Sequence, residues 1–567
     1  MKMKSNIKII IIANLFVLLS ACVDLNLNPL SEASSETWFK EVDQFEMSVN
    51  DLFKPAFWQV DDIEWTDDYV RREILNAITN GTLNSDWAYL ANAWSNKYKA
   101  IARSNSILNY IDFANIPQTS KDIIIGNAAF VRAAQYSYLI DHWGDVVLYT
   151  ELLSLEDAFA LGRTEKSKVL SQIYEDFDTA IAKLPVSYGG KQLATKGAAL
   201  AMKARIALHQ EDWVVARNAS KACLDLGIYD LFPNYGELFK SSTKNPKEVI
   251  FAIPASEEFG VYNLWPVISV QGVISRISGG QANNYPSFEL FCAYPCTDGL
   301  PINKSPLFNP REPFLNRDPR LLETIVPFGE NYFGYPYYSH PDSLTVFNTN
   351  TGAFVKNANA LSVDRYAPYN GLLWKKGVDQ FWFDNIVRNK NDLIIMRYAD
   401  VLLMYAEAKI ELNDIDQSVF DAINMVRARA YKVSISDTSN YPAVVEQDQN
   451  KLRQLLRNER RIEFAYEPHR YMDIIRWKLA EKVLKKPIYG LLPVDLLRKK
   501  IIDKGLWFFP DIPEIDEEYI ADLGSMYEVG YYRILSRPNF DISKQYLWPI
   551  PSKEIRINTN MTQNPGY

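Results

Sequence analysis

The sequence predicts a mainly α-helical protein, in which a tetratricopeptide-like helical-repeat scaffold carries a long irregular, loop-rich insertion. Three observations support this fold class. Apolar residues recur every three or four positions through much of the chain, as in amphipathic helices. Residues 194–227 form a pair of such helices with the 34-residue length of one tetratricopeptide unit. Between about 255 and 390 this periodicity disappears.

The first 22 residues have the pattern of a bacterial lipoprotein signal. Three lysines precede a largely apolar run at 9–19, and small residues then lead to Cys22. We expect residues 1–21 to be removed and Cys22 to carry acyl chains that hold the protein on a membrane surface. The apolar run of about 11 residues is too short to span a bilayer, which needs about 20. The alternatives are an ordinary signal peptide or an uncleaved anchor.

The scaffold is predicted over about 36–254 and again over about 393–485. Its first stripe consists of Trp38, Val42, Phe45, Val49 and Leu52, and similar stripes run through 94–111 and 169–184. Gly144 follows an apolar run and predicts a helix stop. In 194–227 the two helices divide at 210–212, and alanines allow them to approach closely. An irregular α-bundle is the alternative to a repeat.

The insertion at about 255–390 is predicted to pack irregularly over the scaffold and to carry a ligand surface. Gly, Pro and Asn are frequent there, and aromatic residues exceed the 13% of the whole chain. So long a stretch without regular structure is uncommon in a compact domain unless it is functional. Four helices then return at 394–412, 418–431, 452–466 and 470–484, and residues 540–567 are predicted to form an extended tail across the bundle.

Composition and charge argue against several partners. The 567 residues are 47% hydrophobic, and no low-complexity linker divides them, so residues 22–567 are predicted to form a single domain. The net charge of −8 falls to −11 when the lysines of residues 1–21 are lost. This negative charge argues against nucleic acid as a partner and favours a neutral ligand over an acidic one.

Metal and disulfide chemistry have little support in the sequence. A zinc site needs four ligands, and the four histidines lie far apart in sequence, so we expect no metal and no cofactor. Cys292 and Cys296 lie four residues apart. In an exported protein they are close enough to form a disulfide if the backbone bends.

Five segments carry a resemblance to a known family. They are Met396 to Ala408, Ile423 to Arg429, Asn458 to Trp477, Trp548 to Pro551, and the ending Gln563 to Tyr567. In this order and spacing they resemble the SusD/RagB family of nutrient-binding outer-membrane lipoproteins from Bacteroidetes. Trp143-Gly144-Asp145, the pair 194–227 and residues 316–321 agree as well, so the resemblance covers nearly the whole mature chain.

The resemblance implies a non-catalytic binding protein, anchored by lipid and exposed on the cell surface. It also implies a partner, a TonB-dependent outer-membrane transporter of the SusC type, over which the protein sits as a hinged lid. The charged residues of the matching helices are interpreted as partly buried ion pairs that fix helix register. Glu459 and Glu463 lie one helical turn apart, yet neighbouring arginines would keep both ionised and unsuited to acid–base catalysis.

The ligand site cannot be transferred from the family, so it is predicted from chemistry. Sugars suit an aromatic platform flanked by carboxylates, amides and arginine. Three places offer this: residues 65–71 with Trp87, residues 262–265, and residues 364–366 with 381–384. The ligand-binding candidates are Trp65, Asp67, Trp87, Trp265, Arg365 and Trp382. Each has a structural alternative, since a tryptophan between helices is usually core and an Asp or Arg is often paired or at the surface.

Three functions are compatible with these patterns. The leading hypothesis is capture of oligosaccharides and their delivery to the transporter. A second keeps the fold but binds peptides, as in the RagB branch. A third is a surface glycoside hydrolase, which needs two carboxylates at a defined separation; no recognisable catalytic motif supplies them.

Overall fold

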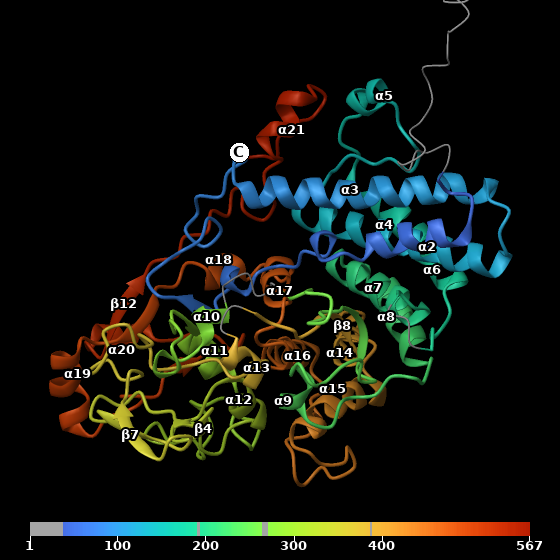
Figure 1. Cartoon of the computed structure of the whole chain (residues 1–567). Helices are drawn as coiled ribbons and strands as arrows, with labels where there is room; N and C mark the ends of the chain where they lie inside the picture. Colours follow the sequence, from blue (N-terminus) through green and yellow to red (C-terminus); the bar gives the residue numbers. More distant parts are fainter. Residues whose placement is uncertain (1–37, 190–192, 264–269, 386–387) are drawn as a thin grey trace, which may run out of the picture.

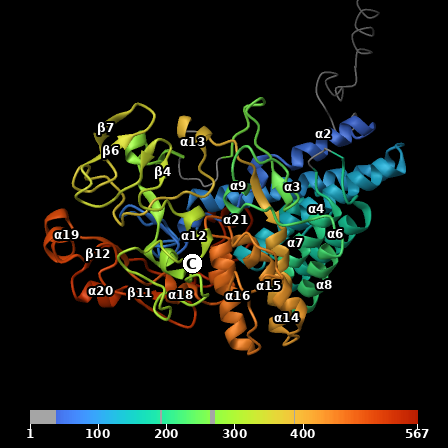
Figure 2. The ribbon, with the colours of Figure 1, turned by 90° about the horizontal axis from the view of Figure 1, so that it is seen from below.

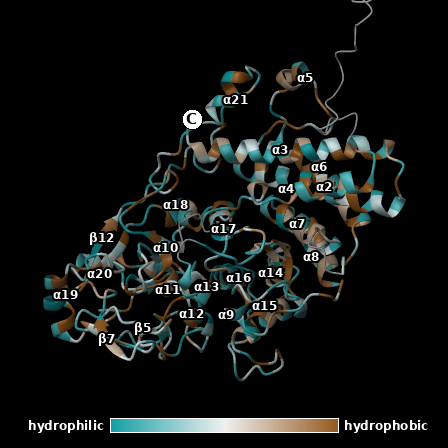
Figure 3. Cartoon of the chain, viewed as in Figure 1, coloured by the Kyte–Doolittle hydropathy of each residue, from teal (hydrophilic) through white to brown (hydrophobic). Residues whose placement is uncertain are grey.

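The computed structural model describes residues 38–189, 193–263, 270–385 and 388–567. Six helices build the N-terminal scaffold, and each packs against the next along the chain (Figure 1). They are α2 (Val42–Leu52), α3 (Ala88–Tyr110), α4 (Gln118–Trp143), α6 (Lys166–Lys183), α7 (Lys196–His209) and α8 (Trp213–Leu224). Hydrophobic and hydrophilic segments alternate along α3, as expected for a helix with one buried face (Figure 3).

The sequence signals for helix ends are confirmed. Gly144 ends α4 with a φ of +73°, a backbone conformation that residues with a Cβ rarely adopt. The helix pair expected at 194–227 is α7 and α8. Its second helix begins after Asp212, whose carboxylate accepts the Val215 N–H at 3.2 Å. The helical-repeat scaffold is therefore confirmed.

The chain returns to the scaffold through α14 (Tyr398–Glu411), α15 (Gln417–Ala430), α16 (Gln449–Glu463), α17 (Arg470–Arg476) and α18 (Ala480–Val483). Two expectations need correction. Residues 394–397 belong to strand β8 (Leu393–Arg397), because this apolar stretch pairs with β2 (Val249–Ile253). The helix expected at 470–484 is two helices, since the backbone turns at Lys478 with a φ of +57°.

The insertion folds around its own apolar core, separate from that of the helical stack. This core joins Trp374 and Phe288 to residues of the C-terminal segment 488–532, such as Phe509 and Tyr532. Figures 1 and 2 both place the insertion and this segment on one side of the scaffold helices. The segment had no predicted structure of its own.

The remaining helices and strands, most of them in the insertion and the C-terminal segment, are short, and these strands pair antiparallel in twos. They are α9 (Tyr235–Leu238), α10 (Val270–Val273), α11 (Phe288–Ala293), α12 (Pro319–Thr324), α13 (Gln380–Asp384), α19 (Val494–Lys500), α20 (Gly524–Glu528), β1 (Tyr69–Arg71), β3 (Asn284–Pro286), β4 (Asn331–Tyr332), β5 (Tyr335–Pro336), β6 (Thr345–Asn348), β7 (Ala353–Lys356), β9 (Ile488–Leu491), β10 (Glu514–Ile515), β11 (Ala521–Asp522) and β12 (Tyr532–Ser536).

The C-terminal tail crosses the scaffold and is anchored by buried tryptophans. The Trp548 indole donates to the Tyr471 hydroxyl at 2.9 Å, and the Trp143 indole donates to the Pro549 carbonyl at 2.9 Å. The tail is not wholly extended, because it contains helix α21 (Ser552–Ile557). This helix and α5 (Leu155–Ala160) lie above α3 in Figure 1. No helix within the described residues is long and apolar enough to cross a membrane.

Candidate ligand-binding site

One exposed surface of the insertion gathers arginine and tyrosine side chains from separate segments. We call it the arginine–tyrosine surface. It consists of Arg72, Arg276, Arg365, Tyr366, Tyr369 and Arg533. It joins the first and third places predicted from the sequence, the segment around residue 71 and residues 364–366. The fold brings together residues that are up to about 460 positions apart in the sequence.

Arg72 is positioned by the short ladder between β1 and β3. Its N–H extends the ladder by donating to the Asn283 carbonyl at 2.9 Å. Its guanidinium Nη2 donates to the carbonyls of Gln281 at 3.0 Å and Ala282 at 3.3 Å, and also to that of Tyr366. Carbonyls fix the side chain without neutralising its charge, so Arg72 stays a full positive charge at the surface.

Tyr366 is the exposed platform of the surface, with 40% of its area open to solvent. The guanidinium carbons of Arg365, Arg72 and Arg276 lie 4.6, 5.2 and 5.8 Å from the centroid of its ring. Arg365 also donates to the Tyr366 hydroxyl at 2.5 Å. Cation–π contact of this kind orders both partners.

Asp364 holds the loop that carries the platform. Its Oδ2 accepts from Nε and Nη2 of Arg276 at 3.0 and 2.9 Å, and its Oδ1 accepts the Tyr366 N–H at 2.8 Å. The ring is therefore held by an ion pair and a backbone turn before any ligand arrives. Pre-ordering of this kind lowers the entropy cost of binding.

Tyr369 supports the opposite side of the surface. Arg72 and Arg533 lie 5.3 and 4.7 Å from its ring centroid. Its carbonyl accepts the Leu491 N–H at 2.7 Å, which ties the loop to β9. Arg533 lies 3.7 Å from a carboxylate oxygen of Glu73, and both side chains are partly exposed, so this ion pair is weak.

A row of amides borders the same surface. Asn283 donates to the side-chain carbonyl of Gln281 at 3.2 Å, and Gln281 donates to that of Gln271 at 3.3 Å. Ring face, guanidinium donors and amides together can hold a polar ring-shaped ligand, with its C–H face on Tyr366 and its hydroxyls on the edge groups. Arg365, exposed within this surface, stays a prediction as a ligand contact.

Trp65 is placed differently from the expectation. It is only 3% exposed and packs edge-on against Trp548 and Tyr471, with ring centroids 5.3 Å away in each case. A ligand could reach this ring only by displacing the C-terminal tail, so the structure corrects Trp65 to a core residue. Trp87 is half-buried and stacks on Tyr89 at 5.2 Å. Its role as a ligand contact stays a prediction.

Asp67 is also corrected from ligand contact to internal ion pair. Its carboxylate accepts from Arg470 at 2.9 Å through both oxygens, and Arg461 donates to Oδ2 at 2.9 Å. Burial alone would raise the pKa of Asp67, but these two arginines hold it well below its ordinary value. The Asp67 carboxylate therefore joins the segment before β1 to the scaffold.

Trp382 belongs to a second hollow, which we call the amide pocket. It is open to solvent on one side, and its lining includes Asn245, Asn263, Asn389 and Asn391 together with Phe239 and Trp382. Trp382 is 2% exposed, and its indole donates to the Asn389 side chain at 2.5 Å. Its ring is therefore part of the pocket wall, and its role as a ligand contact stays a prediction. Trp265 lies outside the described residues.

The two neighbouring cysteines are buried and unbridged. Cys292 lies in α11 and Cys296 follows its end, and both thiols are free. Burial raises the pKa of the Cys292 thiol to about 12, so it stays protonated and unreactive. The disulfide considered from the sequence is not formed in this structure. Cys22 lies outside the described residues.

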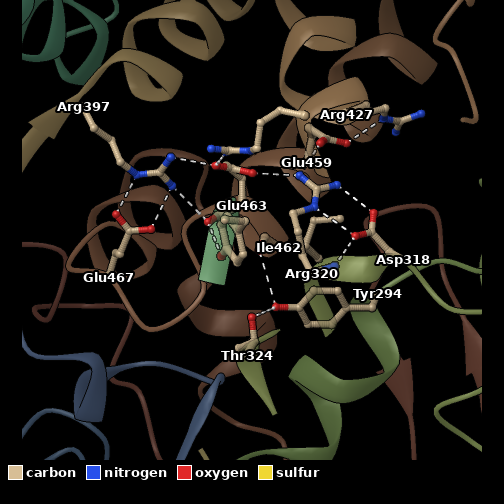
Figure 4. Close-up of polar contacts among 12 residues, drawn as sticks. Tyr294, Asp318, Arg320, Thr324, Arg397, Arg427, Glu459, Ile462, Glu463 and Glu467 are labelled. Atoms are coloured by element: carbon tan, nitrogen blue, oxygen red, sulfur yellow. Dashed lines mark hydrogen bonds and ion pairs between the residues drawn. The ribbon is translucent and has the colours of Figure 1, made fainter. Parts of the chain in front are cut away.

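Charged residues of the returning helices and of the insertion form a buried ion-pair network, shown in Figure 4. Glu463 is at its centre and accepts from Arg397 at 2.6 Å, from Arg320 at 3.0 Å, and from Arg429. The network consists of Arg320, Lys376, Arg397, Arg427, Arg429, Glu248, Asp318, Glu459, Glu463 and Glu467. Because Arg320 comes from α12 and Glu463 from α16, the network joins the insertion to the scaffold.

The network is structural, as expected from the sequence. Burial alone would raise the pKa of Glu463, but Arg429, Arg397 and Arg320 hold it well below its ordinary value. A second cluster uses the same pairing, since both carboxylate oxygens of Glu407 accept from Arg476 at 2.5 and 2.8 Å. The pairs are more deeply buried than expected. Within the described ranges, no group of three or more His, Cys, Asp or Glu side chains is arranged to hold a metal ion.

Four members of the arginine–tyrosine surface were not predicted: Arg72, Arg276, Tyr369 and Arg533. The tandem Arg71-Arg72, set in a break of helical periodicity beside Trp65, was an available signal for the first. Nothing local marks Arg533, because it reaches the surface through the pairing of β12 with β9.

Comparison with known proteins gives consistent matches. Residues 247–567 match the model of the "SusD family", and residues 35–208 match a model described as "Starch-binding associating with outer membrane". SusD-like protein P25 of Formosa agariphila is 27% identical over 409 residues, which cover 70% of this chain and 72% of that protein. SusD-like protein P2 of the same organism is 23% identical over 583 residues, which cover 98% of each chain.

Among solved structures, a SusD-like carbohydrate binding protein from Bacteroides fragilis is 28% identical and has a TM-score of 0.75. The match covers 93% of this chain and 100% of that one.

Proposed function

This chain belongs to the SusD family, and we propose that it is an outer-membrane lipoprotein that binds oligosaccharides at the cell surface. In this proposal it acts by capture alone, without catalysis, and delivers its ligand as a lid to a SusC-type TonB-dependent transporter. The observation that carries the proposal is the arginine–tyrosine surface, which presents an exposed ring with donors on its edges. The solved B. fragilis relative, named as carbohydrate binding, supports the ligand class.

The proposed location rests on the N-terminal pattern and on a family description. Cys22 follows an export signal with small residues before it, as a lipidated cysteine does. The model matched by residues 35–208 is described as associating with the outer membrane. A lid close to a transporter raises the local concentration of ligand, so that modest affinity for the free glycan is sufficient.

The charge of the whole chain favours a neutral oligosaccharide over a polyanion. The charge at the site itself is a separate matter, because salt screens exposed charges beyond about 10 Å. The peptide-binding alternative would favour a groove that reads a peptide backbone. The exposed ring and the amide row favour a sugar instead.

A surface glycoside hydrolase is the other alternative. Glu289 and Glu64 line one small hollow; burial raises the pKa of Glu289 to about 7 and that of Glu64 above its ordinary value. A general acid needs a raised pKa of this kind. At the arginine–tyrosine surface, by contrast, Asp364 and Glu73 both face arginines. If the protein released new sugar ends from a glycan and Glu289→Gln abolished that release, the result would favour the hydrolase.

The test is calorimetric titration of the chain from residue 24 onward, which keeps every residue that the structure describes. The ligands are a panel of neutral and acidic oligosaccharides and mixed peptides, each checked afterwards for cleavage. We expect saturable binding of one glycan class without cleavage. Binding of peptides alone, or cleavage of the glycan, would overturn the proposal.

A further inference from the structure

We infer that the glycan held at the arginine–tyrosine surface is anionic and carries a carboxylate or a sulfate ester. This inference rests on the proposed function and adds the substrate class. It departs from the neutral ligand expected from the net charge of the chain. The number of charges at the surface, their geometry and the contacts of its arginines support the inference.

The surface has an excess of positive charge. Four guanidiniums, those of Arg72, Arg276, Arg365 and Arg533, face two carboxylates, Asp364 and Glu73. The local balance is therefore +2 in a protein whose overall charge is −8. Because distant charges are screened, a ligand at Tyr366 senses the local excess rather than the average.

The positive charges are also crowded. Three guanidinium carbons lie within 5.8 Å of the centroid of one ring, that of Tyr366, and one carboxylate, Asp364, pairs with one of the three arginines, Arg276. Like charges held this close repel one another. An anion placed over the ring would relieve this repulsion, whereas a neutral sugar would not.

Two of the arginines have no acidic partner. Within the described part of the chain, no carboxylate oxygen lies within 4.0 Å of a guanidinium nitrogen of Arg72 or Arg365. Arg72 is held by carbonyls, and Arg365 donates through Nη2 to the Tyr366 hydroxyl. Arg365 is exposed, so its remaining N–H groups can form the forked pair with a carboxylate or sulfate that arginine geometry favours.

The experiment compares ligands that differ only in charge. A sulfated galactan oligosaccharide is titrated beside its desulfated form, and an oligogalacturonate is titrated beside its methyl ester. The first pair tests sulfate and the second tests carboxylate, and an acidic peptide is included as a third kind of anion. Each titration is repeated at 50 and 300 mM NaCl, because an ion-paired ligand binds more weakly at higher salt.

The variant is Arg365→Gln, and its control is Arg217→Gln. Arg217 is a partly exposed arginine on α8, which lies away from the insertion in Figures 1 and 2. We expect at least one charged glycan to bind tenfold or more tightly than its neutral form, with the difference reduced at high salt. Arg365→Gln should remove most of this difference by weakening the charged form far more than the neutral form, and Arg217→Gln should change the binding of neither form.

Each other outcome contradicts the inference in a recognisable way. Equal binding of charged and neutral forms, or a preference that survives Arg365→Gln unchanged, would overturn it and leave the proposed function standing. Binding of no glycan at all would overturn both. Binding of the acidic peptide alone would replace both with the peptide-binding function.

Discussion

The buried ion-pair network and the arginine–tyrosine surface use the same side chain in opposite ways. In the network, Arg397 is fully buried and reaches three carboxylates, those of Glu248, Glu463 and Glu467. At the surface, Arg72 and Arg365 contact carbonyls and tyrosine rings. A buried arginine must find its counter-charge within the protein, because isolated burial of a charge is costly. An exposed one can leave its charge for a ligand.

This difference assigns stability to one region and recognition to the other. The network joins α12 of the insertion to α16 of the scaffold, so its loss should loosen the whole molecule. The surface lies on loops and the ends of short strands, so its loss should change binding and little else.

Acid should destabilise the buried ion pairs most strongly, both those of the network and those of the second cluster, where Asp473 pairs with Arg460 and Arg476 beside Glu407. Burial alone would raise the pKa of Asp473, but Arg460 and Arg476 hold it at about 2, and arginines likewise hold Glu463 well below its ordinary value. As the pH falls from 4 to 2.5, the unfolded chain takes up protons that these carboxylates resist in the folded chain, so stability decreases. Asp473 alone should contribute about 1 kcal/mol to this decrease in the free energy of unfolding. Denaturant unfolding at the two pH values measures it; an unchanged free energy of unfolding would contradict the account.

Glu463→Ala should cost about 3–5 kcal/mol of unfolding free energy, because three buried arginines lose a shared carboxylate. The matched control is Glu165→Ala, which removes an exposed partner of Lys168 and should cost no more than about 0.5 kcal/mol. Urea unfolding of the two variants measures both. Similar losses in the two would mean that burial of the network contributes nothing special.

Tyr366→Ala should weaken glycan binding about fivefold, equivalent to about 1 kcal/mol, because the ligand loses its stacking face. Unfolding should be unchanged within error, since the ring is 40% exposed. Phe354→Ala is the control: this ring is 73% exposed on the β6–β7 hairpin but lies outside the arginine–tyrosine surface. Calorimetric titration compares them, and equal loss in both would show that exposure of any aromatic is enough.

The smallest expected effect is that of a reducing agent. If ion pairs and packing alone hold the insertion, reduction should leave the unfolding midpoint of the chain from residue 24 unchanged. Thiol titration of the unfolded chain should then find Cys223, Cys292 and Cys296 all free. A single reactive thiol would instead reveal a bridge between Cys292 and Cys296.

Local patterns predicted the scaffold well because its information is local. The stripe through Phe45, Val49 and Leu52, the cap at Asp212 and the stop at Gly144 each act within one or two helical turns. The β2–β8 pairing was missed, because its partners are more than 100 residues apart and each alone resembles helix or loop.

The site was harder to predict than the scaffold. Trp65 and Asp67 are residue types that suit a ligand site. In the structure Trp65 packs against Trp548 and Asp67 pairs with Arg470, so both are core residues, and these partners lie some 400 residues or more further along the chain. Arg365 was proposed because it stands among polar and aromatic neighbours. Its companions Arg276 and Arg533 are brought beside it by tertiary contacts that no short pattern encodes.

The most direct test of the central claim is a crystal structure of the chain from residue 24 with the oligosaccharide that binds it most tightly. The account predicts a sugar ring stacked on Tyr366, with its polar groups within hydrogen-bonding distance of Arg365 or Arg72. A sugar bound in the amide pocket beside Asn389 and Asn391, or elsewhere with Tyr366 uncovered, would contradict it.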